Sequence, residues 1–595
     1  MDRDLSRDER EVFKSLLSRV QSPGQYVGGE WNSITKDHRN ASLTFALAFP
    51  DTYPIGMSHL GMQILYHILN RESDILAERV FAPWLDMETL LREKHLPLLS
   101  IETRTPLGRF DVLGFSLQYE LSFTNVLNML ELAGIPLMSC DRMETDPLVV
   151  AGGPVTFSPE PMADFIDLFF IGDAEENLIP FCRKLIDLKS RRTPRQQILK
   201  ELVTSLPGLY APSLYQVHYL DDGTIDGICP IEEGIPRVVE GQMVALERAP
   251  FPDSPIVPSV ETVHDRMAIE IMRGCAGACR FCQAGATKGP VRFRSPETIL
   301  RLAETIYRNT GLDEISLVSL SSSNYPHLVE LASKLNSYFA PKGVGISLPS
   351  LRVDEKIAQI PALVSAVRKA GLTLAPEAAS QRLQRVIRKE MCEDTLMAAL
   401  EEARRLGWRA LKLYFMVGLP TETMEDVEAI GHLVKRALAF RRAPVGAPIQ
   451  LNVAVSSFIP KALTPFQWEP MAERPYLEEA HALLRRMLPR GRVRLKTQGL
   501  RMSFLEAVFS RGDRRLSKVL LLAHEAHSRF DAWHDQFDFT KWQAAFDRSG
   551  LDPSFYASRR RPLDEVFPWS HLRAGSSPEA LRREYERSLE DAKAS

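Results

Sequence analysis

Three cysteines on one short loop constrain this chain of 595 residues more than any other feature. Cys275, Cys279 and Cys282 directly follow a strand-like apolar run, Met267–Met272. Thiolates at this spacing can hold an iron–sulfur cluster, because such clusters are normally bound by cysteine sulfurs. Three local thiolates with no obvious fourth would leave one iron open to another ligand. The sequence therefore predicts a metal cluster at the end of a strand.

Two other uses of cysteine fit this pattern less well. Zinc prefers four ligands in paired groups, whereas Cys229 and Cys392 are isolated in the sequence. Disulfides are disfavoured because the cysteine count of seven is odd. The chain opens on the charged run Asp2-Arg3-Asp4 rather than on a secretory leader. We therefore expect a cytoplasmic protein with reduced thiols.

The spacing Cys-x3-Cys-x2-Cys, with Phe281 before the last cysteine, resembles the signature of the radical S-adenosylmethionine (SAM) enzymes. The resemblance implies a [4Fe–4S] cluster bound by Cys275, Cys279 and Cys282, with SAM on the fourth iron. It further implies reductive cleavage of SAM to a 5′-deoxyadenosyl radical, which abstracts hydrogen from an unactivated C–H bond. A flavodoxin- or ferredoxin-type electron donor is expected.

The length predicts about three or four domains, and the composition is that of an ordinary globular protein. Of its residues 45% are hydrophobic and 25% charged, and the net charge of -3 provides no general attraction to nucleic acid. Because no apolar run approaches the roughly 20 residues that span a bilayer, we expect no membrane insertion. Basic clusters, which we interpret mainly as solvated helix ends or loops with RNA contact as the alternative, occur at Arg191-Arg192, Arg441-Arg442 and Arg559-Arg560-Arg561.

In the central region short apolar runs alternate with helical patterns, which predicts βα units, a parallel sheet and an incomplete (β/α)6 barrel. The predicted strands are Ala268–Met272, Glu314–Ser319, Val344–Leu348, Leu372–Ala375, Leu411–Val417 and Leu451–Ser456. Amphipathic segments such as Pro296–Tyr307 follow them. Ligands gather at the carboxyl ends of the strands in such folds, and the cysteine loop follows the first.

Candidate SAM or substrate contacts follow the other strands. They are Ser321, Ser322, Ser347, Arg352, Glu377 and Gly418. The serine loop stands where radical SAM proteins often carry Gly-Gly-Glu, so its individual contacts stay open. A surface ion pair is the alternative for Arg352, and a helix-start carboxylate the alternative for Glu377. Gly418 would permit close backbone approach.

The region before the barrel also alternates between strand and helix, and predicts a doubly wound, Rossmann-like α/β domain. Its near-continuous apolar runs are Leu43–Phe49, Val112–Ser116, Leu148–Gly153 and Asp167–Gly172. The order of Ala151-Gly-Gly-Pro154 and Gly172-Asp-Ala-Glu-Glu176 resembles the cobalamin-binding domain that precedes many radical SAM cores. Glycines there would let the backbone approach a corrin.

The match lacks the Asp-x-His-x-x-Gly motif of domains that coordinate cobalt. His59 has no aspartate two residues before it, and Gly61 follows it too closely. A lone histidine is more often a structural or helix-start residue than a ligand. Two alternatives stay open: the domain binds cobalamin without the usual lower histidine, or it binds nothing and serves as a lid or substrate platform.

The remaining segments complete the predicted organisation. Residues 1–24 form a helical lead, 25–215 the B12-binding-like domain, 216–258 a proline-rich linker, 259–490 the barrel and 491–595 a helical region. Phe466 and Trp468 either wall a substrate cavity or pack in the core. Pro568-Trp-Ser-His571 resembles a Pro-Trp-Asp-His motif in a group of uncharacterised B12-domain radical SAM proteins, with Ser570 in place of the aspartate.

Three functions compete at this point. The first is a radical SAM enzyme, with cobalamin-linked methyl transfer if cobalamin binds and with RNA or a ribosomal component as a substrate suggested by related subfamilies. The second is a non-catalytic iron–sulfur scaffold or accessory protein of RNA modification. The third, an RNA-binding module, would require RNA affinity that falls steeply with salt.

Overall fold

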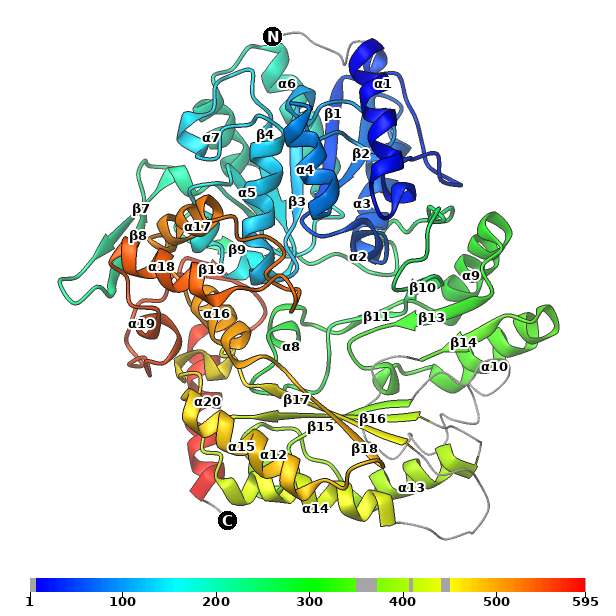
Figure 1. Ribbon diagram of the computed structural model, residues 1–595, viewed down its shortest axis with the longest axis vertical. Helices are drawn as coiled ribbons and strands as arrows, with labels where there is room; N and C mark the ends of the chain where they lie inside the picture. The colour runs from blue at the N-terminus through cyan, green and yellow to red at the C-terminus, as the bar shows by residue number, and fades with distance from the viewer. Residues whose placement is uncertain (1–6, 349–371, 406–409, 440–449, 594–595) are drawn as a thin grey trace.

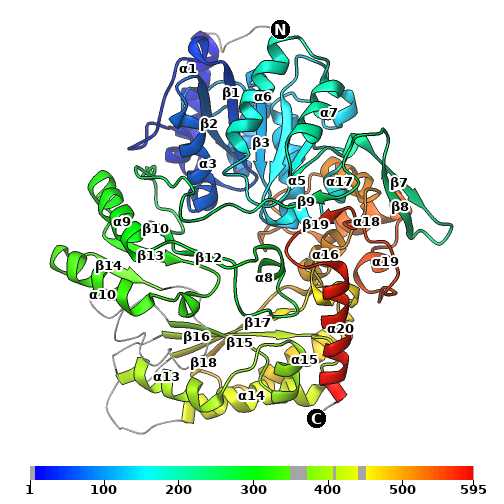
Figure 2. The same cartoon turned by 180° about the vertical axis from the view of Figure 1, so that it is seen from behind.

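The computed structural model describes residues 7–348, 372–405, 410–439 and 450–593. It comprises an N-terminal α/β domain, a second α/β body stacked below it, and C-terminal helices along one side of both (Figure 1). Figure 2 shows the same arrangement from behind, with the last helix reaching down beside the lower body. The α/β class and the order of its parts confirm the prediction from sequence.

The N-terminal domain is built on a six-stranded sheet in the order β2-β1-β3-β4-β5-β6. Its strands are β1 (Leu43–Phe49), β2 (Ile75–Phe81), β3 (Val112–Ser116), β4 (Leu148–Gly152), β5 (Leu168–Phe170) and β6 (Leu209–Tyr210). All neighbours pair in parallel except β5 and β6. The helices include α1 (Arg7–Leu16), α3 (Leu60–Arg71), α4 (Leu85–Glu93), α5 (Phe123–Leu132), α6 (Leu178–Ser190) and α7 (Arg195–Ser205). The predicted doubly wound domain is therefore confirmed.

Strand β2 was absent from the sequence prediction. Its run Ile-Leu-Ala-Glu-Arg-Val-Phe carries Glu78 and Arg79, which interrupt the apolar pattern, yet all seven residues are buried. Arg79 donates to Glu30 at 2.9 Å and to Glu102 at 2.6 Å. Because its charge is neutralised by carboxylates from outside the strand, the sheet tolerates an arginine in its core.

The predicted linker contains more regular structure than its prolines suggested. Strands β7 (Tyr215–Tyr219) and β8 (Ile225–Pro230) form an antiparallel hairpin, and β9 (Val239–Glu240) pairs with β19 (Leu572–Arg573) near the end of the chain. The segment 216–258 is thus not only an irregular connection. Its strands are edge strands, where proline and alternating exposure are allowed.

The second body holds all six predicted barrel strands in two parallel sheets. One sheet has the order β10-β13-β14 and the other the order β15-β16-β17-β18. The bounds are β10 (Met267–Glu270), β13 (Glu314–Val318), β14 (Gly345–Ser347), β15 (Leu372–Glu377), β16 (Ala410–Val417), β17 (Gln450–Ser457) and β18 (Val493–Thr497). Since β18 pairs with β17, the barrel extends beyond the predicted boundary at residue 490. The polar alternation of Val-Arg-Leu-Lys-Thr in this strand gave no sign of a buried sheet.

Helices cover the outside of these two sheets. They are α9 (Pro296–Thr310), α10 (Leu328–Phe339), α12 (Gln381–Val386), α13 (Glu393–Arg405), α14 (Met424–Ala439) and α15 (Arg474–Met487). Helix α9 contains the predicted segment and has a defined start and end. The Ser295 side chain accepts a hydrogen bond from the backbone of Thr298, and Gly311 ends the helix at φ 72°.

The C-terminal region is helical, as predicted, and it joins the two α/β bodies. It contains α16 (Leu500–Ser510), α17 (Leu516–Glu525), α18 (Phe539–Ser549), α19 (Pro553–Ala557) and α20 (Pro578–Lys593). Tyr119 of the N-terminal domain donates to Glu506 of α16 at 2.8 Å, and Arg280 of the cysteine loop reaches Asp591 of α20 at 2.6 Å. None of the helices in the described residues has both the length and the apolar character needed to cross a bilayer.

Candidate functional site

The three cysteines lie on one loop at the end of the first barrel strands, where the sequence placed them. The short strand β11 (Met272–Arg273) leads into the loop, and helix α8 (Gln283–Thr287) leads out with Cys282 as its N-cap. None of the three is in a disulfide, and all three are half-buried. Backbone N–H groups point at two of the sulfurs, from Gly277 to Cys275 and from Gly285 to Cys282, each at 3.3 Å. Such contacts favour the thiolate form.

The loop is shaped to place several thiolates near one another. Burial raises the pKa of Cys282, the Gly285 N–H lowers it, and the neighbouring Cys275 raises it again through charge repulsion. In the described residues, no three His, Cys, Asp or Glu side chains converge at the spacing of a single metal ion. An iron–sulfur cluster, in which each sulfur binds a different iron, stays the prediction for this trio.

The conformation of the cysteine loop is fixed by contacts with the rest of the protein. Gly274 has φ 89°, and a Cβ there would lie 2.7 Å from the carbonyl oxygen of Lys288, so only glycine fits. Arg280 donates from its backbone to the Ile387 carbonyl at 3.1 Å and from its buried side chain to the Val386 carbonyl at 3.0 Å. These contacts hold the loop against the segment that follows α12.

The predicted contact Glu377 lies near the cysteine loop. It occupies the end of β15 at φ 67°, a conformation rarely adopted by a side chain this large, and it pairs with Lys389 at 2.9 Å. Charges on both residues act on the Cys282 thiol: Lys389 lowers its pKa and Glu377 raises it, both after the larger effect of burial. Glu377 belongs to a strand rather than to a helix start, which contradicts the alternative interpretation.

The serine loop after β13 bonds largely to itself. Ser321 donates to the Asn324 side chain at 2.6 Å, and the hydroxyls of Ser322 and Ser319 are 2.9 Å apart. Ser347 is half-buried at the end of β14. Arg352 lies outside the described residues. Roles of these four side chains in SAM or substrate binding therefore stay predictions.

Gly418 ends β16 at φ 78°, and the close approach that it permits is to the protein itself. A Cβ there would lie 2.8 Å from Ala472 and 2.9 Å from Leu477. Its N–H donates to Glu422 at 2.6 Å, and Tyr476 donates to the same carboxyl oxygen at 2.9 Å. Burial raises the pKa of Glu422 to about 7. The sequence pattern gave no reason to single out this carboxyl, because its burial depends on α15.

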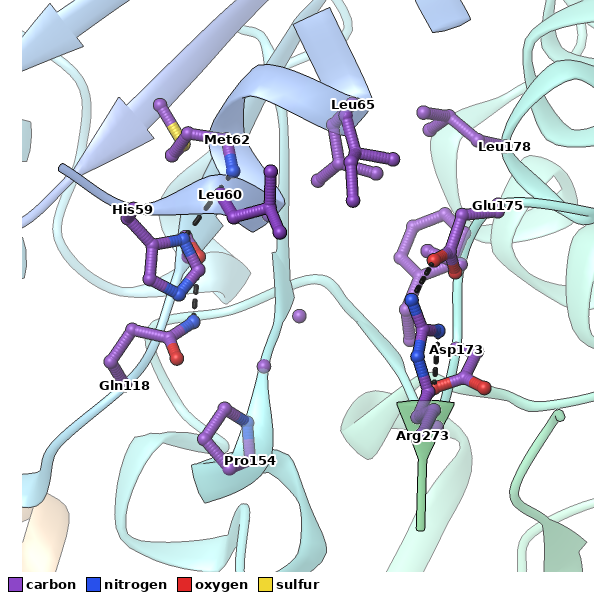
Figure 3. Close-up of a pocket in the computed structure, with 18 of the residues that line it drawn as sticks. His59, Leu60, Met62, Leu65, Gln118, Pro154, Asp173, Glu175, Leu178 and Arg273 are labelled. Carbon is purple, nitrogen blue, oxygen red and sulfur yellow. Dashed lines mark hydrogen bonds and ion pairs between the residues drawn. The ribbon is translucent and has the colours of Figure 1, made fainter. Parts of the chain in front are cut away.

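A cavity of about 420 Å³ separates the N-terminal sheet from the cysteine loop. Both bodies line it. From the N-terminal domain come residues after β1, β3, β4 and β5, including His59, Ser116, Gly152, Pro154, Asp173 and Glu175. From the barrel come Glu270, Met272, Arg273, Ala284, Lys288 and Ser319. Figure 3 shows an apolar wall of Leu60, Leu65 and Leu178, with the charged group Asp173, Glu175 and Arg273 at one side.

His59 is the N-cap of α3, which confirms its interpretation as a helix-start residue. Its Nδ1 accepts from the Met62 N–H at 3.3 Å, and its ring has a second hydrogen bond with Gln118 (Figure 3). Burial lowers the pKa of His59, so the ring is neutral near pH 7. Gly61 makes this cap possible, since a Cβ there would lie 2.7 Å from the imidazole.

The glycines predicted to face a corrin divide into two kinds. Gly153 and Gly172 have φ 113° and 94°, and a Cβ on either would lie within 2.4 Å of a carbonyl oxygen of the chain. Their conformations are required by the fold itself. Gly152 is different, because its nearest neighbour to an added Cβ is Phe170 at 3.8 Å, so it leaves open space at the cavity.

The aromatic and basic motifs pack within the fold. Phe466 and Trp468 are buried, and Trp468 contacts Phe567 and Tyr585, in agreement with the packing alternative. His571 is also buried, 3.8 Å from Glu160. Arg559 and Arg560 pair with Glu565 and Glu469, respectively, and Arg561 is buried. Arg191 pairs with Asp187 in the same helical segment, while Arg441 and Arg442 lie outside the described residues.

Comparisons with known proteins agree with this arrangement. Two family models match, "Radical SAM proteins, N-terminal" over residues 61–212 and "Radical SAM superfamily" over residues 269–434, together more than half of the chain. An uncharacterised protein of Methanocaldococcus jannaschii is 26% identical over 517 residues, which cover 85% of this chain and 97% of that protein.

A second relative matches a smaller part of this chain. The ribosomal protein uS12 methylthiotransferase RimO of Acidothermus cellulolyticus is 30% identical over 214 residues, 35% of this chain and 42% of RimO. This chain thus matches less than half the length of that enzyme. Among solved structures, the radical SAM methyltransferase TsrM of Kitasatospora setae, with cobalamin and a [4Fe-4S] cluster bound, aligns over 85% of this chain and all of that one, at 13% identity and a TM-score of 0.49.

The cysteine loop at the end of β11 falls within the region that the second family model matches. Members of this superfamily use a [4Fe–4S] cluster and SAM, as the resemblance of the motif implied. The chain belongs to the radical SAM superfamily and is a radical SAM enzyme.

Proposed function

We propose that this enzyme methylates an unactivated carbon of its substrate and holds a cobalamin in the cavity between the N-terminal sheet and the cysteine loop. One observation carries the proposal. The same cavity of about 420 Å³ is lined by the strand ends of a doubly wound domain and by the residues that flank the cysteines. Strand ends of such domains are where flat cofactors bind.

Cys275, Cys279 and Cys282 are the proposed cluster ligands. The loop offers three half-buried cysteines outside any disulfide, two of which accept backbone N–H groups. Glu377 and Lys389 would lie beside the bound SAM, because both act on the Cys282 thiol. Ser321, Ser322, Ser347, Arg352 and Gly418 remain proposed contacts of SAM or substrate. When bound, the cluster and SAM supply radical chemistry, and cobalamin supplies a transferable methyl group.

The cavity suits a cobalamin without a protein imidazole on its metal. His59 is the one histidine among the described residues that line the cavity, and its ring is engaged by Met62 and Gln118. Gly152 leaves room for a planar ring to approach the backbone. Leu60, Leu65 and Leu178 would cover the face of such a ring and exclude water (Figure 3).

Anaerobic purification from cobalamin-supplied cells tests both cofactors. We expect about four irons per chain, corrin absorption bands, and release of 5′-deoxyadenosine on reduction. Cys282→Ala should lose the cluster, whereas Cys392→Ala, a matched control at an exposed cysteine, should retain it. Full clusters without any SAM cleavage would favour the alternative, an iron–sulfur scaffold.

The cavity is tested separately by filling it. Gly152→Leu places a side chain in the open space and should abolish corrin binding with iron content unchanged. Gly227→Leu is the control, because its Cβ has similar space, with Cys229 at 3.8 Å, and lies in the β7–β8 hairpin away from the cavity. Equal corrin content in the two variants would contradict the proposed position.

We propose a ribosome-related substrate, a flavodoxin- or ferredoxin-type electron donor and a cytoplasmic location. The substrate proposal rests on the similarity to RimO, whose name gives ribosomal protein uS12 as its target. Transfer of a labelled methyl group from SAM into ribosomes from a strain lacking this protein would test it. Label found only in small molecules would contradict it.

A further inference from the structure

One buried carboxylate of the N-terminal domain pairs with cations at both ends of the cysteine loop. Asp173 follows β5 of the N-terminal sheet, and its side chain is 2% exposed. It forms an ion pair with Arg273 at 3.1 Å and accepts hydrogen bonds from Lys288 at 2.9 Å and from Arg292 at 2.8 Å. All three cations belong to the barrel.

These cations stand on both sides of the three cysteines in the sequence. Arg273 precedes Cys275, while Lys288 and Arg292 follow Cys282. Arg273 and Arg292 are direct partners in the antiparallel pair of β11 and β12 (Arg292–Phe293). Like charges directly opposite each other on neighbouring strands repel. The Asp173 carboxylate, which pairs with both arginines, offsets that repulsion and helps to hold the two ends of the loop together.

Asp173 is itself rigidly held. Its backbone N–H donates to the Gln242 carbonyl at 2.8 Å, and its carboxylate accepts from the Val244 N–H at 3.2 Å. Burial alone would raise its pKa, but the charges of Lys288 and Arg273 hold the pKa of Asp173 well below its usual range. The group is therefore an anion near neutral pH.

Asp173 also faces the cavity between the domains, together with Glu175 and Arg273 (Figure 3). Arg273 is shared, because it donates to Glu175 at 2.6 Å and to Glu270 at 2.8 Å as well. Asp173 and Arg273 thus line the cavity and also pair at the end of the cysteine loop. We expect a change in the cavity wall at these residues to alter the conformation of the loop.

We propose that Asp173 is a positioning residue, which sets the conformation of the cysteine loop across the domain boundary and so tunes the cluster. The inference rests on the proposed function only in assigning the cluster to Cys275, Cys279 and Cys282. It does not depend on which molecule fills the cavity. It predicts that loss of the Asp173 charge, which lies outside the loop, changes the conformation of the loop and the reduction potential of the cluster.

A matched control exists six residues earlier in the chain. Asp167 has the same side-chain exposure of 2%, and it also accepts from two arginines, Arg142 at 3.0 Å and Arg195 at 2.7 Å. Those partners both belong to the N-terminal domain. Asp167→Asn therefore removes a buried charge from the same domain without touching the cysteine loop.

The first measurement uses hydrogen exchange on the metal-free full chain. In Asp173→Asn we expect the amides of residues 274–293 to exchange at least tenfold faster than in the wild type. Asp167→Asn should leave these amides unchanged and affect its own surroundings. Asp173→Glu keeps the negative charge, so the same amides should stay largely protected from exchange. Unchanged exchange in Asp173→Asn, or equal acceleration in the Asp167→Asn control, would overturn the proposal.

The second measurement uses the reconstituted cluster. At equal iron content, Asp173→Asn should shift the cluster to a higher reduction potential and change its electron paramagnetic resonance spectrum, because net positive charge nearby favours the reduced state. Asp173→Glu should return both toward wild type. A potential and spectrum like those of the wild type would count against tuning. If even the wild type binds no iron, the proposed function fails, and the exchange measurement still decides whether Asp173 holds the loop.

Discussion

Single side chains in this enzyme gain their roles from the elements that surround them. His59 is the clearest example, since a histidine beside a cofactor domain suggests a metal ligand. Its Nδ1 accepts the Met62 N–H at the start of α3 and thereby satisfies one of the free donors of that helix. The histidine stabilises a helix, and cofactor binding in the cavity need not involve it.

This role leads to a first prediction. His59→Ala should lower the free energy of unfolding by about 1 kcal/mol, the usual loss for a removed N-cap. Corrin content after purification from cobalamin-supplied cells should stay at the wild-type level. Urea unfolding and the visible spectrum measure the two effects. Complete loss of corrin bands in a folded variant would show that His59 contacts the cofactor.

Glu422 gives a second prediction at this scale, on pH. Burial raises its pKa to about 7, above the 4.5 of an unfolded chain, so the folded state holds this proton more tightly. The contribution of this proton to the free energy of unfolding is complete below pH 4.5 and is lost as the pH rises through 7. Glu422→Gln keeps an acceptor for Gly418 and Tyr476 but cannot ionise.

The stability of the wild type relative to Glu422→Gln should therefore fall by up to about 3 kcal/mol between pH 5 and pH 8. Chemical unfolding of both proteins at several pH values provides the measurement. Two parallel curves across this range would mean that Glu422 is ionised throughout.

At the scale of elements, strand β2 shows how a charged sequence becomes a core strand. Arg79 lies in the middle of seven buried residues and is neutralised by Glu30 and Glu102. Neither carboxylate belongs to the strand, so the pairing is visible only after the chain has folded. Removing the arginine would leave two buried anions without a cationic partner.

We therefore expect Arg79→Met to destabilise the protein by about 3–5 kcal/mol. Arg183→Met is the control, because Arg183 pairs with Glu72 and Asp74 at the surface of the same domain and should cost less than about 1 kcal/mol. Thermal and urea unfolding compare the two. A similar small loss in both variants would mean that water reaches Glu30 and Glu102.

At the scale of the whole molecule, one lysine connects three distant parts of the chain. Lys461, after the barrel strand β17, donates to Glu120 at 2.7 Å and to Glu506 at 3.0 Å. Glu120 follows the N-terminal strand β3, and Glu506 belongs to α16. The C-terminal region thus takes part in the contact between the N-terminal domain and the barrel.

Lys461→Met should leave these two buried carboxylates without a cationic partner and cost about 3–5 kcal/mol. We expect the domains to separate in unfolding, with two calorimetric transitions where the wild type shows one. Lys518→Met is the control, since its ammonium contacts the Ser549 carbonyl alone among the interactions described. One unshifted transition in Lys461→Met would contradict a connecting role.

Much of the fold followed from local patterns. The apolar run Leu43–Phe49 is a fully buried parallel strand, because a strand covered on both faces must be apolar throughout, and Leu411–Val417 is a parallel strand in which every second residue is buried. The cysteine spacing likewise predicted the loop on which we place the cluster. Strands β2 and β18 were missed, since their charged residues break the pattern.

The sequence by itself determined the parallel sheets, their order along the chain and the metal-binding motif, because periodicity and ligand spacing are local properties. Only the tertiary structure decided which charges meet. Asp173 lies about a hundred residues before Arg273 and Arg292 in the chain, yet it holds both ends of the cysteine loop. The cavity and the contacts of this carboxylate depend on how two domains pack, and packing is set by contacts that no local pattern records.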